Sequence, residues 1–565
     1  MQRSLGKKKT ILSLVAGAFL AANTFAPVPA NASADVDTMK QQIDEMQETI
    51  DELDERLNEA ELHTATDKVS FGVELRTKAD SIHYGDMLFA KQALIGKFFT
   101  PFDGTPAGGF NGVTLPAAQA MMPMLPMMWG PLLPAEKSDI TNDIIYTNKF
   151  RLNMKSKINN NLAFGGRLAA YKVYGDSSGV KFNSGSLGDV TFDGNTTSLP
   201  HGDTLRMERA YFNYKNQIGS VPYNFSLGRR PSTDGPPLEY GNYSLEGGSP
   251  MATIINWQFD GASLSFGLEE LTSIPGFSFK LCYGLGFESD WGNSYSLTST
   301  STVEDVHLAG FISSLYDDDT TKVELNYAHA SDITDGFTGL TVMPFIVSKS
   351  DQYTDDPLTG ARTNGPDGLD EYYFAQNAGG FINRMQPMTN IGDWDAATVV
   401  VRSNVKDIDL FGSVSWSHTK ATKISQNPFY ELMGQSLLSS NGQLDENDGY
   451  MFLIGAVFPM PGEGRFGLEY NHGSEYWFNF TGAEDSLVAS KMAVRGDVYE
   501  GYYIQPIFDD NFFIKASYQF IDYEYTGSGN PMGAPVKITE ASGIDALFPI
   551  IDTVWNAALS ATMRF

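Results

Sequence analysis

The sequence predicts a transmembrane β-barrel behind a signal peptide and a short coiled coil, and three observations lead to this fold class. Segments of about ten residues alternate apolar with polar or small side chains, as strands of membrane barrels do. The connections between these segments are alternately short and long. The chain ends on an amphipathic strand in which Trp555 and Phe565 are the expected barrel-assembly signal. A soluble β-sandwich also alternates, but the long strands and the loop pattern favour the barrel.

Residues 1–32 have the parts of a secretory signal peptide. Four basic residues precede an apolar run from Ile11 to Ala22, and small residues at Ala30, Ala32 and Ala34 provide cleavage sites. The apolar run is too short for an uncleaved membrane anchor, because a spanning helix needs about 20 apolar residues. We therefore expect an exported protein.

Residues 33–66 are predicted to form a coiled-coil segment in the periplasm. Apolar side chains recur at alternating spacings of three and four residues, which is a heptad pattern. We expect this stripe to mediate self-association of identical chains. The alternative is an amphipathic helix that lies on its own barrel. The predicted core residues are Val36, Met39, Ile43, Met46, Ile50, Leu53 and Leu57.

Residues 67–565 are predicted to form the barrel, with both chain ends in the periplasm. Barrels of this kind have short periplasmic turns and long external loops, which places the long loop 331–393 outside. Asp260-Gly261 is a strong hairpin signal, but a hairpin there would invert this topology, so we interpret the pair as a bulge inside one strand. The count is then sixteen strands, which enclose an aqueous lumen. They are expected to start near residues 69, 147, 162, 204, 222, 254, 277, 304, 321, 394, 408, 449, 464, 496, 512 and 554.

Composition excludes several classes of function. The net charge of −29 argues against nucleic-acid binding. A single cysteine, Cys282, excludes an intramolecular disulfide, and there is no C-x-x-C-H motif for covalent haem. The acidic runs at 317–319 and 445–449 are better explained by turn chemistry than by Ca²⁺ binding. No nucleophile motif stands out, so we expect neither an enzyme nor a cofactor or metal site.

Four segments carry a resemblance to a known group of proteins. They are DKVSFGVELRTKADSIHY, DTLRMERAYFNYKN, YNFSLGRRPSTDGPP and FDGASLSF, which begin at residues 67, 203, 223 and 259. Together they resemble an uncharacterised family of proteobacterial outer-membrane barrels and, more distantly, coiled-coil-tethered porins, including phosphate-selective ones. The resemblance covers most of the mature chain. It implies a homotrimer in the outer membrane, surrounded by lipid and lipopolysaccharide, and leaves the solute open.

Strand parity places a group of basic side chains on the lumen side of the barrel. If Phe150 and Leu152 face lipid, their neighbours in the sequence face the lumen. The third external loop, 231–250, contains acids, and in general porins the third loop folds inward and sets acids opposite a basic wall. The alternative is a set of hydrated lumen charges without a role in selectivity. The candidate pore-lining residues are Lys149, Arg151, Lys155, Arg167, Arg209, Arg230, Asp234 and Glu239.

These features predict a porin-like channel for passive diffusion of small hydrophilic solutes or ions. The alternative is a barrel that serves as a sheath or scaffold for an outer-membrane complex, such as an electron-transfer conduit, or as a cell-wall tether. The apolar segment 121–134 contains four prolines and is not a spanning helix. Whether it plugs the mouth, caps a neighbouring subunit or touches lipid stays open.

Overall fold

The structure, a computed structural model, describes residues 69–565 apart from eleven gaps. The gaps are 106–107, 175–201, 245–246, 288–302, 339, 343–344, 356–361, 378–381, 385–386, 483 and 509. The predicted signal peptide and coiled coil lie outside the described residues. None of the helices in the described part combines the length and the hydropathy that crossing a membrane requires.

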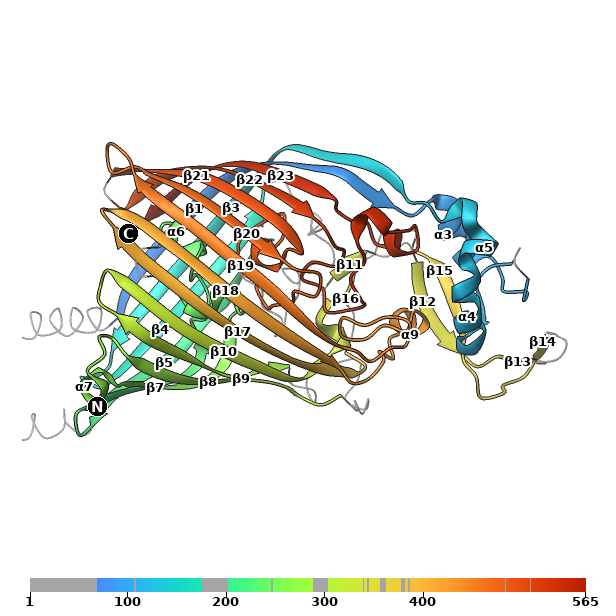
Figure 1. The fold of residues 1–565 in the computed structure, drawn as a ribbon, viewed down its shortest axis with the longest axis horizontal. Helices are drawn as coiled ribbons and strands as arrows, with labels where there is room; N and C mark the ends of the chain where they lie inside the picture. The colour runs from blue at the N-terminus through green and yellow to red at the C-terminus, as the bar shows by residue number, and fades with distance from the viewer. Residues whose placement is uncertain are drawn as a thin grey trace, which may run out of the picture. The chain divides into compact units, whose positions relative to one another are not determined.

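Sixteen antiparallel strands close into one barrel, as the sequence predicts (Figure 1). Neighbours in the ring are neighbours along the chain, and the ring closes where β1 pairs with β23. The strands are β1 (Val69–Phe89), β3 (Glu136–Lys157), β4 (Leu162–Val173), β5 (Gly202–Ile218), β6 (Val221–Arg230), β7 (Phe259–Gly267), β8 (Ser278–Phe287), β9 (Val306–Asp317), β10 (Thr321–Thr334), β17 (Asn390–Val405), β18 (Ile408–Ala421), β19 (Glu446–Pro459), β20 (Arg465–Gly473), β21 (Gly496–Phe508), β22 (Phe512–Tyr523) and β23 (Thr553–Arg564).

Two details of the predicted strands are wrong. β3 begins at Glu136 rather than near 147, because its first residues are exposed on both faces and lack the apolar alternation of a membrane strand. β7 begins at Phe259, and Asp260-Gly261 lies in unbroken register with β6 and β8. The pair is therefore not a hairpin, which agrees with the prediction. It is not a bulge either, which contradicts the prediction. A Cβ on Gly261 would lie 2.1 Å from the Tyr283 carbonyl oxygen, so close approach of β8 explains the glycine.

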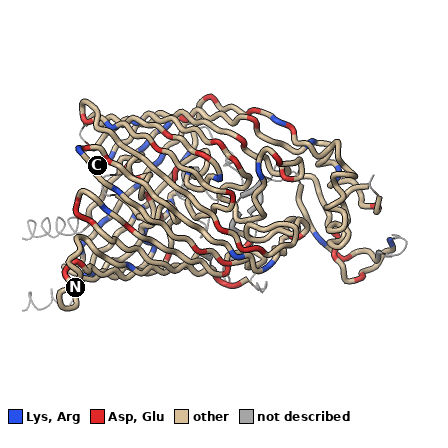
Figure 2. The backbone as a smooth tube through the Cα atoms, in the orientation of Figure 1, with Lys and Arg blue, Asp and Glu red and all other residues tan. Residues whose placement is uncertain are grey.

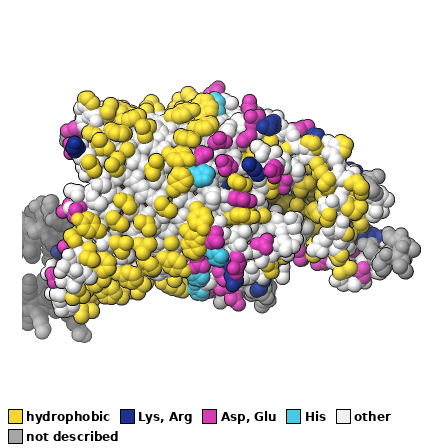
Figure 3. All heavy atoms as spheres, in the orientation of Figure 1, with side chains coloured by type: hydrophobic (Ala, Val, Ile, Leu, Met, Phe, Trp, Pro, Cys, Tyr) yellow, Lys and Arg dark blue, Asp and Glu magenta, His cyan; other side chains and the backbone are white. Residues whose placement is uncertain are grey.

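The two ends of the barrel differ in their connections. The C-terminus and the short turns lie at one end, and the long connections gather at the other (Figure 1). Between them, hydrophobic side chains cover the outer surface (Figure 3). Val414, Ile454 and Leu559 on this surface are each more than half exposed. A closed sheet with an apolar outer face is the form that a lipid bilayer accepts.

A cap of short elements covers the long-connection end. A three-stranded sheet in the order β12-β15-β2 joins segments 90–135 and 335–389. Phe98, Phe345 and Phe374 pack there with ring centroids 5.0 to 5.2 Å apart. The elements are α3 (Gln92–Phe99), β2 (Val113–Thr114), α4 (Leu115–Met121), η1 (Met122–Met124), α5 (Leu125–Trp129), η2 (Gly130–Leu132), η5 (Asp335–Thr338), β11 (Leu340–Val342), β12 (Phe345–Ser350), β13 (Tyr353–Asp355), β14 (Arg362–Asn364), β15 (Glu371–Gln376), β16 (Ile382–Arg384) and α9 (Pro428–Leu432).

The Met- and Pro-rich segment 121–134 forms part of this cap. It folds into η1, α5 and η2, in which prolines occupy the first turns, where a missing N–H costs nothing. Leu125 and Trp129 are buried, whereas Met124 and Met127 are exposed. The segment therefore packs into the cap of its own chain and keeps two methionines at the surface.

Candidate solute pathway in the lumen

Two long connections fold into the barrel. Segment 231–258 links β6 to β7 and contains α6 (Leu238–Gly241) and η4 (Pro250–Thr253), and segment 474–495 links β20 to β21 and contains η6 (Lys491–Ala493). They meet through two backbone hydrogen bonds. The Asn256 N–H donates to the Phe480 carbonyl at 2.6 Å, and the Phe480 N–H donates to the Ile254 carbonyl at 2.9 Å.

Aromatic side chains explain why these connections enter the lumen. Trp477, Phe478 and Phe480 are fully buried, and the ring of Phe480 lies 4.7 Å from that of Trp394 on β17. The Trp394 indole N–H donates to the Phe478 carbonyl at 3.1 Å. In an external loop these rings would face water, whereas against the wall of the lumen each buries roughly 150–250 Å².

Segment 231–258 bridges the lumen from one wall to another. On β5, the Arg209 guanidinium donates to the Asp234 carboxylate at 2.8 Å. On β17, the Arg402 guanidinium donates to Glu239 of α6 at 2.9 Å. Next to Glu239, Tyr240 stacks on Phe411 of β18 with ring centroids 4.1 Å apart. The first part of the segment is therefore anchored to two separate parts of the wall.

Segment 474–495 is anchored to the basic wall by Asp485. The Lys149 ammonium lies 2.5 Å from the Asp485 carboxylate, and the guanidiniums of Arg76 and Arg151 lie 3.6 and 3.9 Å from it. Arg151 also forms a bidentate pair with Glu208 at 2.8 and 2.9 Å. Lys149 and Asp485 are both only 5% exposed, so their charges interact at close range with little screening by solvent.

The inner cavity, with a volume of about 560 Å³, lies beside this network. Ser70, Asn511 and Phe565 among its lining residues place its opening at the short-turn end. Figure 2 shows both basic and acidic residues along the barrel strands. The lining contains ten bases and five acids among the described residues: Arg76, Lys78, Lys149, Arg151, Lys155, Arg167, Arg209, Lys491, Lys515 and Arg564, with Glu74, Asp234, Glu484, Asp485 and Glu500.

Six of the eight candidate pore-lining residues meet at the inner cavity. They are Lys149, Arg151, Lys155, Arg167, Arg209 and Asp234. Glu239 lies apart, between Arg402 and Gly248, and Arg230 is paired in register with Phe259 at the end of β6. Asp485 and the inward course of segment 474–495 were not expected from the sequence, which predicts an external loop there. The signal was present, because three large aromatic residues within four positions are unusual for an external loop.

Burial and charge act in opposite directions on the acids of the inward segments. Burial raises the pKa of Glu484 to about 7, although Lys491 and hydrogen bonds from Ser490 and two backbone amides favour its ionised form. For Asp485, burial would also raise the pKa, but Lys149, Arg76 and Arg151 outweigh it and hold the pKa below the usual value. The two neighbouring acids therefore respond to different ranges of pH.

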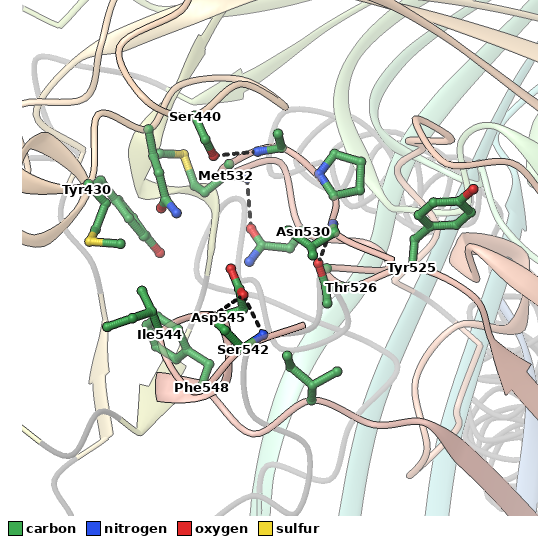
Figure 4. Close-up of a pocket in the computed structure, with 18 of the residues that line it drawn as sticks. Tyr430, Ser440, Tyr525, Thr526, Asn530, Met532, Ser542, Ile544, Asp545 and Phe548 are labelled. Atoms are coloured by element: carbon green, nitrogen blue, oxygen red, sulfur yellow. Dashed lines mark hydrogen bonds between the residues drawn. The ribbon is translucent and has the colours of Figure 1, made fainter. Parts of the chain in front are cut away.

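An outer cavity of about 1240 Å³ lies among the long connections (Figure 4). Its wall includes the rings of Tyr430, Tyr525 and Phe548, and Asp545 is the single charged residue among the described residues that line it. Segment 474–495 contributes to both cavities. Ala489, Ser490 and Ala493 face the outer one, whereas Glu484, Asp485 and Lys491 face the inner one. This segment is therefore the partition between them.

Comparisons with known proteins identify a sequence family and several similar solved structures. The sequence model of a family described as "Protein of unknown function (DUF3373)" matches residues 139–565. No curated protein sequence matches the chain. Similar solved structures include OprB of Pseudomonas putida, with 12% identity, a TM-score of 0.40 and coverage of 89% of this chain and 96% of that one. Another is OmpF of Salmonella typhi in complex with daunomycin, with 11% identity, a TM-score of 0.37 and coverage of 87% and 97%.

Proposed function

The chain belongs to the DUF3373 family, whose function is unknown, and we propose that it is a porin-like channel of the bacterial outer membrane for passive diffusion of small hydrophilic solutes and ions. The observation that supports this most is the contrast between the two faces of the closed sheet. The outside is apolar, whereas the inside holds a charged cavity that opens at one end. Such a barrel isolates a polar route from lipid.

The narrowest part of the route is proposed to lie between the inward segments and the basic wall of Lys149, Arg151 and Arg167. Low-dielectric walls focus the field of fixed charges, so a local excess of bases outweighs the acidic charge of the whole chain. Ten bases against five acids favour anions at this point. Rings of charged side chains select ions on this principle in other pores. The preference should weaken with salt, because the Debye length is about 10 Å at 0.1 M.

Occupation of the lumen favours a channel over a sheath. A sheath needs room for another protein inside the barrel, but segments 231–258 and 474–495 occupy much of that space, pack on the wall through Trp394 and Phe411, and leave a cavity of about 560 Å³. A sheath would also carry haem protein through purification. A cell-wall tether would depend on residues outside the described part, and it would not conduct.

The assembly is proposed to be a homotrimer joined by the segment 33–66, with the outer face in contact with lipid and lipopolysaccharide. The heptad pattern supports the joining role, because its apolar stripe needs a partner surface. Cross-linking tests this assembly. It compares the purified full-length protein with a variant whose Ile43 and Ile50 are replaced by Asp. Loss of the cross-linked trimer in the variant is the expected result.

Planar-bilayer recordings of the purified full-length protein test the channel itself. In a salt gradient, the triple variant Lys149→Gln, Arg151→Gln, Arg167→Gln should shift the reversal potential toward cations. The matched control is Arg151→Gln with Glu208→Gln, which removes one base and one acid and should leave the selectivity unchanged. If the triple variant conducts normally and its reversal potential does not shift, these residues have no role in ion selectivity. A parent protein that does not conduct would refute the channel.

A further inference from the structure

Every histidine in the described part of the chain lies in one band on the outer face of the barrel. Figure 3 shows these side chains along the border where the hydrophobic surface gives way to acidic residues. They come from five different strands, β1, β9, β10, β18 and β20, and are His83, His307, His329, His418 and His472. The inward segments do not use them, so the band needs its own explanation.

Three of these histidines share one arrangement with an aromatic residue and an aspartate. His329 and Tyr327 of β10 both bond to Asp395 of β17, at 2.9 and 2.5 Å. The remaining two sets repeat this geometry. His418 and Trp416 bond to Asp448 at 3.1 and 2.9 Å, and His472 and Tyr470 bond to Asp497 at 2.9 and 2.7 Å. In each set the aromatic residue stands two positions before the histidine, and the aspartate comes from the next strand.

Strand register places two of the three sets side by side. His329, Asp395, His418 and Asp448 are direct register partners across four neighbouring strands. The aromatic residues of the three sets lie one outward-facing position nearer the short-turn end. Aromatic girdles mark the two interfaces of a membrane barrel. The histidines therefore lie just beyond the girdle, at the depth of the lipid headgroups of the leaflet that faces the long connections.

The orientation of the imidazoles leaves one ring nitrogen for a partner outside the protein. In all three sets the aspartate is bonded to Nδ1, and the side chains of His329, His418 and His472 are 41%, 26% and 29% exposed. Among the described residues, the hydrogen bonds of these rings involve Nδ1 alone. Nε2 is thus the atom that each ring can offer to a lipid.

The charges around each ring are mainly acidic. His329 faces Asp395, and His418 lies between Asp395 and Asp448. Beyond His418 on its own strand, Lys420 is paired with Glu446 at 3.5 Å. His472 faces Asp497 on one side and the neutral Phe452 on the other, and Asp497 is itself in register with Asp522. Without the imidazoles, this band would repel anionic headgroups.

We propose that the three His–Asp pairs form a binding surface for phosphate groups of lipid headgroups in the outer leaflet. A doubly protonated imidazole donates Nδ1–H to the aspartate and Nε2–H to a phosphate oxygen. Hydrogen bonds between ionised partners are about twice as strong as neutral ones. The inference rests on the membrane location proposed above, but not on conduction.

Binding of diphosphorylated lipid A to the full-length protein in detergent tests this surface. Native mass spectrometry counts the bound lipids for the parent and for the variant His329→Gln, His418→Gln, His472→Gln. The parent should bind about tenfold more tightly than the triple variant, the size of one lost charge-assisted hydrogen bond. The matched control is His83→Gln with His307→Gln, because these rings are bonded to Thr141 and Tyr283 hydroxyls instead of aspartates.

Each outcome of this experiment decides the proposal. Binding that is lost in the triple variant and kept in the control supports it. Equal binding by the triple variant, or equal binding of lipid A from which both phosphates have been removed, overturns it. Equal binding of phosphatidylglycerol would show that phosphate alone suffices and that the glycolipid sugars add nothing. The triple variant should keep the conductance of the parent, so failure here is distinct from failure of the channel.

Discussion

Asp485→Asn should release segment 474–495 from the wall of the lumen. The carboxylate is the shared partner of Lys149, Arg76 and Arg151, and an asparagine of the same shape keeps the volume but not the charge. Removing one partner of a buried ion pair typically costs 3–5 kcal/mol. The lower end applies here, because Glu74 lies 3.2 Å from Lys149 and still compensates its charge.

The consequence for the channel follows from the position of the segment as a partition. A cost of about 3 kcal/mol shifts the balance between docked and undocked segment by about a hundredfold, since every 1.4 kcal/mol is tenfold. Undocking joins the inner cavity to the outer one. Single-channel recordings should therefore show frequent transitions to a larger conductance in Asp485→Asn that are rare in the parent.

A double variant separates the ion pair from other effects of the substitution. In Lys149→Gln with Asp485→Asn both members are removed, so the energetic penalty should be smaller than the sum of the two single variants. The frequency of large openings should fall between the parent and Asp485→Asn. If Asp485→Asn shows the same conductance and the same opening frequency as the parent, the partition role of the segment is refuted.

Three further predictions concern pH, topology and assembly. Burial raises the pKa of Glu484 from 4.5 to about 7, so the docked form of segment 474–495 is favoured when this carboxyl is neutral. This stabilisation is lost as the pH rises from about 4.5 through 7. Large openings should be more frequent at pH 8 than at pH 5, and Glu484→Gln should flatten this dependence; a parent insensitive to pH contradicts it. An epitope tag after Thr363 should bind antibody on intact cells, whereas a tag after Thr320 should not; the reverse labelling would invert the topology. A peptide of residues 36–60 should associate in analytical ultracentrifugation and become monomeric with Ile43→Asp; a monomeric parent peptide contradicts the coiled coil.

The strand count was predictable because lipid imposes a regular pattern on the chain. Each strand must alternate where one face meets hydrocarbon, and the loop lengths then fix the direction of every strand. The pattern failed where that constraint is missing. The first part of β3 lies beyond the membrane region, so its start was placed too late, and Gly261 is explained by a neighbouring backbone that no sequence pattern reveals.

The candidate site was predictable in part for the same reason. The alternation of side chains between the two faces of a strand identified Lys149, Arg151 and Arg167 as residues on the lumen side. It did not identify Asp485, because this residue reaches them from a connection 336 positions away in the chain. Contacts between a wall and an inward loop depend on how the loop folds, and alternation carries no information about loops.

The bridge formed by segment 231–258 gives the barrel a mechanical property. A hollow sixteen-stranded ring flattens easily under lateral pressure, because its hydrogen bonds hold neighbouring strands together but do not tie separate walls. Here the Arg209–Asp234 and Arg402–Glu239 pairs fasten residues 234–239 of one segment to two such walls. Compression of the ring along this line therefore loads the two ion pairs directly. They tie β5 to β17 across the inside of the barrel, a link that hydrogen bonds between neighbouring strands do not supply.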